Sequence, residues 1–415
     1  MLILLFVGAC GGQTADTFPT VAPTAAQTAV PSPNATPIVA NNVPPTWTPS
    51  TTDQLPTLNA GRESNPNATP TLVGAIPTFT IVPPTPTATL TPSLTPTATR
   101  YVSFVPNLPP SDELGPSKVG LHVNRNNSPE IMEFVRRAQP AVMKGVADLG
   151  YMAEVKIESP RTTTVGRIPV ENQDYGGNPE EKARELVAEQ LREYELNPAI
   201  DYWEGWNEPD PGLERMDWYA RFEAERVREM ARHGFKTAVG GFSTGVPELD
   251  EFELFVPAIE AAIEHAGILT LHEYSAPSIE YGFGSPLPDQ TPQPDRGALI
   301  FRYRWYYEEI LIPRGLYVPL VISEAGIDGL VGPRPGPNGQ GWKDFRSYWT
   351  DQGVWGSTGR EAYINQMAWY DNGIRRDGYV IGIALFTAGG GSRWESYDLN
   401  NILPELADYV IGQGP

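Results

Sequence analysis

The sequence predicts an α/β fold, a (β/α)8 TIM barrel over residues 114–415, preceded by a disordered linker rich in proline and threonine. About 300 residues follow the linker, which is a typical size for one such barrel. They alternate apolar strand patterns with amphipathic helix patterns eight times, which indicates a parallel sheet covered by helices. The rival is an open, doubly wound sheet, but no Gly-x-Gly-x-x-Gly follows the first strand and no Walker loop occurs.

The predicted strands are short and apolar, as expected of strands that are buried on both faces. They are expected at residues 118–123, 141–146, 162–168, the first half of 201–210, 236–242, 268–274, 318–325 and 379–386. The fifth ends in the small residues Gly240 and Gly241, which suggests a close approach of backbone or ligand at that point.

Helix signals separate the strands. Ser128 is a good N-cap and Pro129 suits the first helical position, while the run that begins at Asn178 and Pro179 keeps apolar residues at helical spacing up to Glu195. Helices are expected from residue 128 onward and at about 148–158, 178–195, 214–233, 253–266, 298–312, 360–376 and 404–411. A long loop, residues 328–358, is expected between the seventh strand and its helix.

The first residues predict a signal segment over residues 1–12. Met1 to Ala9 form an apolar run that is too short to span a bilayer, which needs roughly 20 residues. Val7-Gly8-Ala9-Cys10 resembles a bacterial lipoprotein signal, in which Cys10 is lipidated after cleavage before it. The alternative is that Cys10 is only a small residue of a signal core. The resemblance implies an extracellular protein anchored to the bacterial membrane through Cys10, whose true start lies upstream because no positive residue precedes the apolar run.

Residues 13–113 form the predicted disordered linker. Between residues 13 and 110 there are 20 Pro and 22 Thr in 98 residues and only five charged side chains. Such a segment buries too little apolar surface to offset its chain entropy, so we expect an extended stalk. Residues 13–110 carry −1 of the net charge of −20, which leaves −19 for the rest of the chain. That sign disfavours nucleic acid and anionic membrane surfaces as partners, so we expect membrane contact only through the lipid anchor. We also expect a monomer.

Polar residues at the carboxyl ends of the predicted strands define a candidate site, because barrel enzymes build their sites there. Glu208 and Glu324 are 116 residues and three strands apart, which at about 39 residues per unit places them across the same rim. The collected residues are His122, Arg167, Asn207, Glu208, His272, Tyr274 and Glu324. Taken singly, each has a plainer interpretation as a turn, capping or core residue.

Asn207-Glu208-Pro209 and Val321-Ile322-Ser323-Glu324-Ala325-Gly326 resemble the acid/base and nucleophile motifs of the clan A glycoside hydrolases, retaining cellulase-like and xylosidase-like barrels. The resemblance covers about residues 118–411. It implies that Glu208 is the acid/base, Glu324 the nucleophile, Tyr274 a donor to the nucleophile and Asn207 a ligand of the sugar 2-hydroxyl. It also implies subsite or orienting roles for His272, Arg167 and, with less support, His122, and it implies no metal or organic cofactor.

One departure and one further hypothesis concern the surroundings of the site. Many clan members end strand eight with a Trp, whereas this strand ends in Phe386 and the nearest Trp is Trp394. Glu204 should point into the barrel, where Lys144 or Arg167 could pair with it and make it structural.

The predicted loop 328–358 carries Trp342, Tyr348, Trp349 and Trp355 among its glycines and prolines. Trp342 and Trp349 are candidate sugar-binding rings, although such rings equally well pack a loop onto a barrel.

The function implied is a surface-anchored retaining glycoside hydrolase that cleaves β-glycosidic bonds in a poly- or oligosaccharide. Two alternatives stay open at this point. One is a non-catalytic carbohydrate-binding or adhesin protein that keeps the barrel, and the other is a transglycosylase with the same residues.

Overall fold

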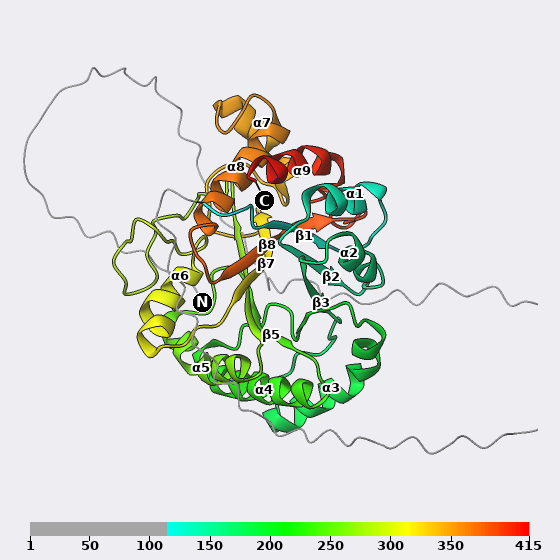
Figure 1. Ribbon diagram of the computed structural model, residues 1–415. Helices are drawn as coiled ribbons and strands as arrows, with labels where there is room; N and C mark the ends of the chain where they lie inside the picture. Colours follow the sequence, from blue (N-terminus) through cyan, green and yellow to red (C-terminus); the bar gives the residue numbers. More distant parts are fainter. Residues whose placement is uncertain (1–113, 415) are drawn as a thin grey trace, which may run out of the picture. The chain divides into compact units, whose positions relative to one another are not determined.

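A computed structural model of the protein describes residues 114–414, which form a closed barrel of eight parallel strands with helices around it (Figure 1). The strands follow one another in sequence order, and β8 pairs with β1 to close the barrel. They are β1 (Val119–Val123), β2 (Val142–Val146), β3 (Thr163–Arg167), β4 (Tyr202–Glu204), β5 (Thr237–Phe242), β6 (Ile268–Ser275), β7 (Leu320–Ile327) and β8 (Val380–Ala388). The predicted (β/α)8 fold is confirmed. The predicted signal and linker, residues 1–12 and 13–113, lie outside the described residues.

Of the two helix starts predicted from local signals, Asn178 has a side-chain cap, whereas Ser128 is the N-cap residue but its side chain makes no capping hydrogen bond. The side chain of Asn178 accepts a hydrogen bond from the N–H of Glu181 at 2.9 Å, and Thr358 caps its helix in the same way. The α-helices are α1 (Pro129–Ala138), α2 (Met152–Glu158), α3 (Pro179–Leu196), α4 (Gly212–Arg232), α5 (Leu249–Glu264), α6 (Tyr303–Tyr306), α7 (Trp342–Gln352), α8 (Gly359–Ile374) and α9 (Leu403–Gly412). Short π and 3-10 turns, η1 (Tyr307–Leu311), η2 (Ile312–Arg314) and η3 (Asn400–Ile402), extend α6 and precede α9. Within residues 114–414, no helix is both long and apolar enough to cross a membrane.

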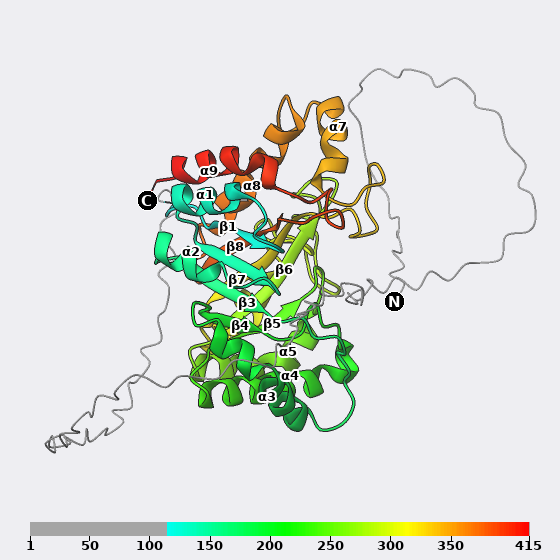
Figure 2. The ribbon, with the colours of Figure 1, turned by 90° about the vertical axis from the view of Figure 1, so that its right-hand side faces the viewer.

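Two helix predictions need correction. The helix expected from residue 298 begins only at Tyr303, because Phe301 has a φ of 55° and its N–H donates to the carboxylate of Glu273 at 2.8 Å. The predicted loop 328–358 contains helix α7, which projects beyond α8 in Figures 1 and 2. The buried residues of α7, Trp342, Phe345 and Trp349, recur at helical spacing.

The barrel interior is layered. An apolar layer consists of Val142, Val165, Ala238, Ile268, Val321 and Ala384, with Tyr202 packed against it. Because side chains two residues apart on a strand point the same way, the next layer along β2, β3 and β4 consists of Lys144, Arg167 and Glu204. The interior therefore changes from apolar to charged toward the carboxyl ends of the strands.

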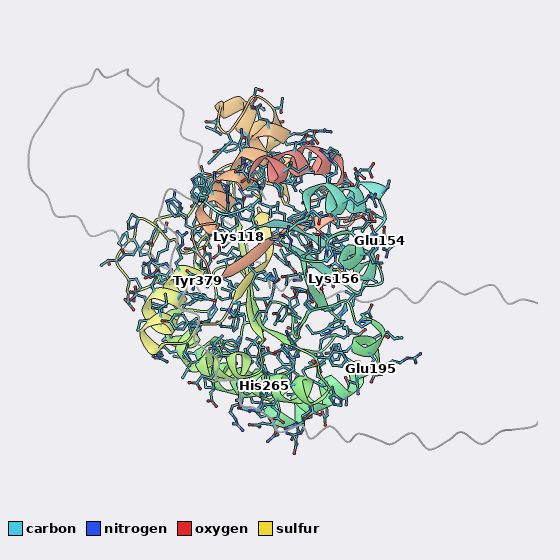
Figure 3. The ribbon with its side chains drawn as sticks, in the orientation of Figure 1. Lys118, Glu154, Lys156, Glu195, His265 and Tyr379 are labelled. Carbon is cyan, nitrogen blue, oxygen red and sulfur yellow. The ribbon has the colours of Figure 1, made fainter. Side chains whose placement is uncertain are left out.

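The opposite end of the barrel is closed by residues that precede the strands. Lys118, before β1, donates through Nζ to the carbonyl of Asp377 at 2.7 Å, and burial lowers its pKa to about 8. Tyr379, before β8, stacks on Tyr307 with ring centroids 3.9 Å apart. Lys118 and Tyr379 are labelled in Figure 3.

Candidate active site

All seven side chains that the strand-end rule selected meet at the carboxyl ends of the barrel strands. They come from β1, β3, β6, β7 and the segment after β4. Hydrogen bonds and ion pairs link them: His122, Arg167 and Tyr274 contact Glu324, Arg167 contacts Asn207, and His272 contacts both Glu208 and Glu324.

Glu324, on β7, has different neighbours at its two oxygens. Oε1 accepts hydrogen bonds from Lys144 Nζ at 3.0 Å and from the Arg167 guanidinium at 3.2 Å, and His122 Nδ1 lies 3.4 Å away. Oε2 accepts a hydrogen bond from the Tyr274 hydroxyl at 3.0 Å, with His272 Nδ1 at 3.6 Å. One oxygen is therefore held by two permanent cations and the other by a neutral phenol.

Glu324 is held ionised although its side chain is only 8 % exposed. Burial alone would raise the pKa of Glu324, but its interactions with His272, Lys144 and Arg167 hold that pKa well below the ordinary value. Burial, together with Lys144 and Arg167, lowers the pKa of His122 to about 3, so this imidazole is neutral at neutral pH. The site thus offers an ionised carboxylate in a largely dehydrated position.

Glu208 follows β4 and is more open, with 28 % of its side chain exposed. Its N–H donates to the carbonyl of Gly241 at 2.9 Å, and its backbone has a φ of 48°. A Cβ at Gly241 would lie 3.1 Å from the carbonyl of Trp206, so the small residues that end β5 allow this close backbone approach, as the sequence predicts. The Ser243 hydroxyl donates to Glu208 Oε1 at 3.2 Å, and His272 Nδ1 lies 3.0 Å from the same oxygen.

The two carboxylates are close together. One carboxylate oxygen of Glu208, one of Glu324 and a ring nitrogen of His272 all lie within 4.8 Å of one another. In retaining glycosidases the two carboxyl groups are about 5 to 5.5 Å apart, whereas inverting enzymes need roughly 6.5 to 9.5 Å to admit a water molecule. The spacing fits a direct attack by one carboxylate and proton transfer by the other.

The same three groups form the one cluster among residues 114–414 whose donor atoms are close enough to hold a metal ion. Lys144 and Arg167 already neutralise Glu324 through Oε1. This competition weakens Glu324 as a ligand for a divalent cation, because the cation would have to approach two fixed positive charges.

Two charged residues of the site were not selected as site residues from the sequence. The hypothesis that Glu204 pairs with Lys144 or Arg167 is confirmed, since its Oε2 lies 2.8 Å from Lys144 Nζ and 3.7 Å from Arg167. Burial alone would raise the pKa of Glu204, but Lys144 and Arg167 lower it to about 2. The contact of Lys144 with Glu324 was missed. A lysine at an inward position of a barrel strand was the signal for it.

The rim next to β8 is aromatic. Phe386 lies edge-to-face with His122 at 4.9 Å and with Tyr274 at 6.1 Å between ring centroids. Tyr397 and the partly buried Trp394 pack on its other side at 5.5 and 5.1 Å. The strand-eight position therefore carries a phenyl ring, and the nearest indole comes from the loop after β8.

Trp342 and Trp349 are buried, whereas a sugar-binding role requires an exposed ring face. Their side chains are 1 % and 0 % exposed. Trp342 Nε1 donates to the carbonyl of Tyr397 at 3.2 Å, and Trp349 Nε1 donates to the carbonyl of Pro277 at 2.7 Å. Both rings fix α7 to neighbouring loops, so the structure favours the packing alternative over the sugar-binding one.

A scan against protein-family models and a search of the curated proteins found no match to this chain. Several solved structures are similar to it. One is a family 39 glycoside hydrolase from Bacteroides cellulosilyticus WH2, with a TM-score of 0.47, 14 % identity and coverage of 72 % of this chain and 64 % of that chain. Others are the endo-β-1,4-mannanase from Thermotoga petrophila (TM-score 0.40, 12 % identity, coverage 73 % and 78 %) and a GH5-4 broad specificity endoglucanase from an uncultured bacterium (TM-score 0.40, 10 % identity, coverage 69 % and 84 %).

Proposed function

We propose that the protein is a retaining glycoside hydrolase that cleaves β-glycosidic bonds in a poly- or oligosaccharide. The observation that carries the proposal is the placement of Glu208, after β4, and Glu324, on β7: one carboxylate oxygen of each lies within 4.8 Å of one oxygen of the other. This spacing supports a double displacement.

In the first step, Glu324 attacks the anomeric carbon. Oε2 is the better placed oxygen, because Oε1 is surrounded by Lys144, Arg167 and His122. As the Glu324 ester forms, the bond from the anomeric carbon to the glycosidic oxygen breaks, and Glu208 gives its proton to that oxygen. The product is an α-linked glycosyl ester and a free alcohol.

In the second step, Glu208 removes a proton from a water molecule that attacks the anomeric carbon. The ester bond breaks, Glu324 leaves as a carboxylate, and the sugar regains its β configuration. Tyr274, which donates to Oε2 at 3.0 Å, stabilises the charge that returns to Glu324. Asn207 would bind the 2-hydroxyl, and the hydrogen bond from Arg167 to its side-chain oxygen supports this role by fixing the amide.

The proposal extends to the rest of the chain. A stalk over residues 13–113 and a lipid on Cys10 would hold the barrel at the outer surface of a bacterium, where its glycan substrate lies. The strong negative charge of the barrel favours a neutral or basic glycan over a polyanionic glycan as the substrate.

Turnover and azide rescue test the proposal. The wild type is screened against 4-nitrophenyl β-glycosides and soluble β-glucans, β-mannans and xylans, and the fastest aryl glycoside is used for the variants. Glu208→Ala should still form the ester from this substrate, and azide should then yield a β-glycosyl azide. Glu324→Ala should form no ester, and azide should yield the α-azide.

Glu195→Ala is the matched control, because it removes an exposed glutamate outside the site (Figure 3). Binding of glycans without turnover by the wild type would support the non-catalytic alternative. Sugar transfer to a second sugar in place of water would support the transglycosylase. An inverted product would exclude the two-step scheme.

A further inference from the structure

Four charged side chains form a buried group beneath the proposed reaction centre. Lys144 is fully buried and lies between two carboxylates, with its Nζ 2.8 Å from Glu204 Oε2 and 3.0 Å from Glu324 Oε1. Arg167 contacts the same two oxygens at 3.7 and 3.2 Å. The group holds two positive and two negative charges, so it is neutral when Glu324 is ionised.

The proposed reaction changes this balance. When the Glu324 ester forms, its negative charge disappears from the group, and Glu208 becomes negative as it gives up its proton. The two cations next to Glu324 therefore oppose the first step, which removes their counter-charge, and favour the second step, which restores it. Glu204 takes no part in bond formation, and its charge stays in place throughout.

We propose that Glu204 is a positioning residue that acts through Lys144: it shares the lysine with the nucleophile and so sets the relative rates of ester formation and ester hydrolysis. The inference rests on the proposed function. With Glu204 present, Lys144 keeps one carboxylate partner in the ester state, so loss of the Glu324 charge costs less. Without it, both cations would depend on Glu324 alone.

A purely structural role for the ion pair between Lys144 and Glu204 explains its position beside Glu324 less well. Buried ion pairs are weak contributors to stability, since desolvation offsets much of their attraction. The chain also holds a buried pair of this kind outside the site, in which Arg226 donates to Glu223 at 2.7 Å. Lys144 differs because its second partner is the proposed nucleophile.

Substitution of Glu204 and substitution of Lys144 should slow different steps of the reaction. Glu204→Gln keeps the volume but removes the charge, so Glu324 is overstabilised as an anion and ester formation slows. We expect kcat/KM to fall by about tenfold or more, with no burst of 4-nitrophenol. Lys144→Met removes the stabilisation of the departing carboxylate, so ester hydrolysis slows. We expect kcat to fall by a similar factor with a lower KM, and a burst of 4-nitrophenol equal to the enzyme concentration.

The experiment is a stopped-flow measurement of full-length wild type and variants on the 4-nitrophenyl β-glycoside that the wild type hydrolyses fastest. Lys144→Met/Glu204→Gln should recover part of the kcat/KM that Glu204→Gln loses, because it removes one charge of each sign. Glu223→Gln is the matched control for a buried carboxylate, and it should change stability without changing the ratio of the two steps. Circular dichroism checks that each variant is folded.

The outcomes distinguish a failure of the proposed function from a failure of the role proposed for Glu204. No turnover of any substrate by the wild type would overturn the proposed function and this inference with it. Turnover by the wild type, with Glu204→Gln and Lys144→Met both slowing the same step, would overturn only the role of Glu204. A variant that does not fold is replaced by Glu204→Asp, which keeps the charge but shortens its reach to Lys144. An unchanged ratio of steps in that folded variant would likewise overturn the inference.

Discussion

Replacing Tyr274 by Phe should reduce activity while leaving the fold intact. The hydroxyl of Tyr274 donates to Glu324 Oε2 at 3.0 Å, and the side chain is 5 % exposed. Burial and the neighbouring Glu324 raise the pKa of Tyr274 well above its ordinary value, so the phenol keeps its proton and acts as a donor. A hydrogen bond to a charged group contributes about 1.5 to 3 kcal/mol. Because this bond stabilises the charge that returns to Glu324 in the second step, its loss corresponds to a fall of roughly 10- to 150-fold in the rate of ester hydrolysis, measured as kcat.

The assay is the pH dependence of kcat on an aryl β-glycoside. Lys144 and Arg167 still hold Glu324 in the variant, so Glu324 should stay ionised at neutral pH, and the loss should appear at all pH values. Tyr363→Phe is the control, because within residues 114–414 its buried hydroxyl has no hydrogen-bond partner. A Tyr274→Phe variant with wild-type kcat, or one that loses no more than Tyr363→Phe, would refute the reasoning.

Three further predictions concern other parts of the chain. Trp349→Ala should lower the free energy of unfolding by about 3 to 5 kcal/mol with an unchanged KM, as seen in urea titration and steady-state kinetics; a raised KM at normal stability would restore the sugar-binding hypothesis. Burial raises the pKa of Glu273 to about 7, so the stability due to its bound proton is complete below pH about 4.5 and is lost as the pH rises to about 7. Glu273→Gln should therefore flatten the unfolding free energy over that range, and an unchanged pH dependence would contradict the assignment. Cys10→Ser should abolish membrane partition in cell fractionation if the signal is a lipoprotein signal, and unchanged partition and processing would exclude it.

The sequence predicts the location of the site well because it depends on two local rules. Alternation along each strand decides which side chains point inward, and the barrel brings all strand ends to one rim. Glu208 and Glu324 could be placed opposite each other on these rules alone. The pairing of Glu204 with Lys144 follows from the cost of burying an unpaired charge.

The side-chain contacts that the sequence does not predict depend on distances across the closed barrel. The contact between Lys144 and Glu324 joins residues 180 positions apart, and it follows from how far each side chain reaches into the interior. Helix α7 was missed because glycine and proline surround it, although Trp342 and Trp349 have helical spacing. The same error made both rings seem available to a sugar.

Trapping of the covalent intermediate tests the central claim most directly. The wild type is incubated with the 2,4-dinitrophenyl 2-deoxy-2-fluoro β-glycoside of the sugar that it turns over, and the product is measured by intact-protein and peptide mass spectrometry. We expect a gain of one fluoroglycosyl group, located on Glu324, and no gain in Glu324→Ala. A label on another residue, or turnover of the parent substrate with inversion and no label, would contradict the account.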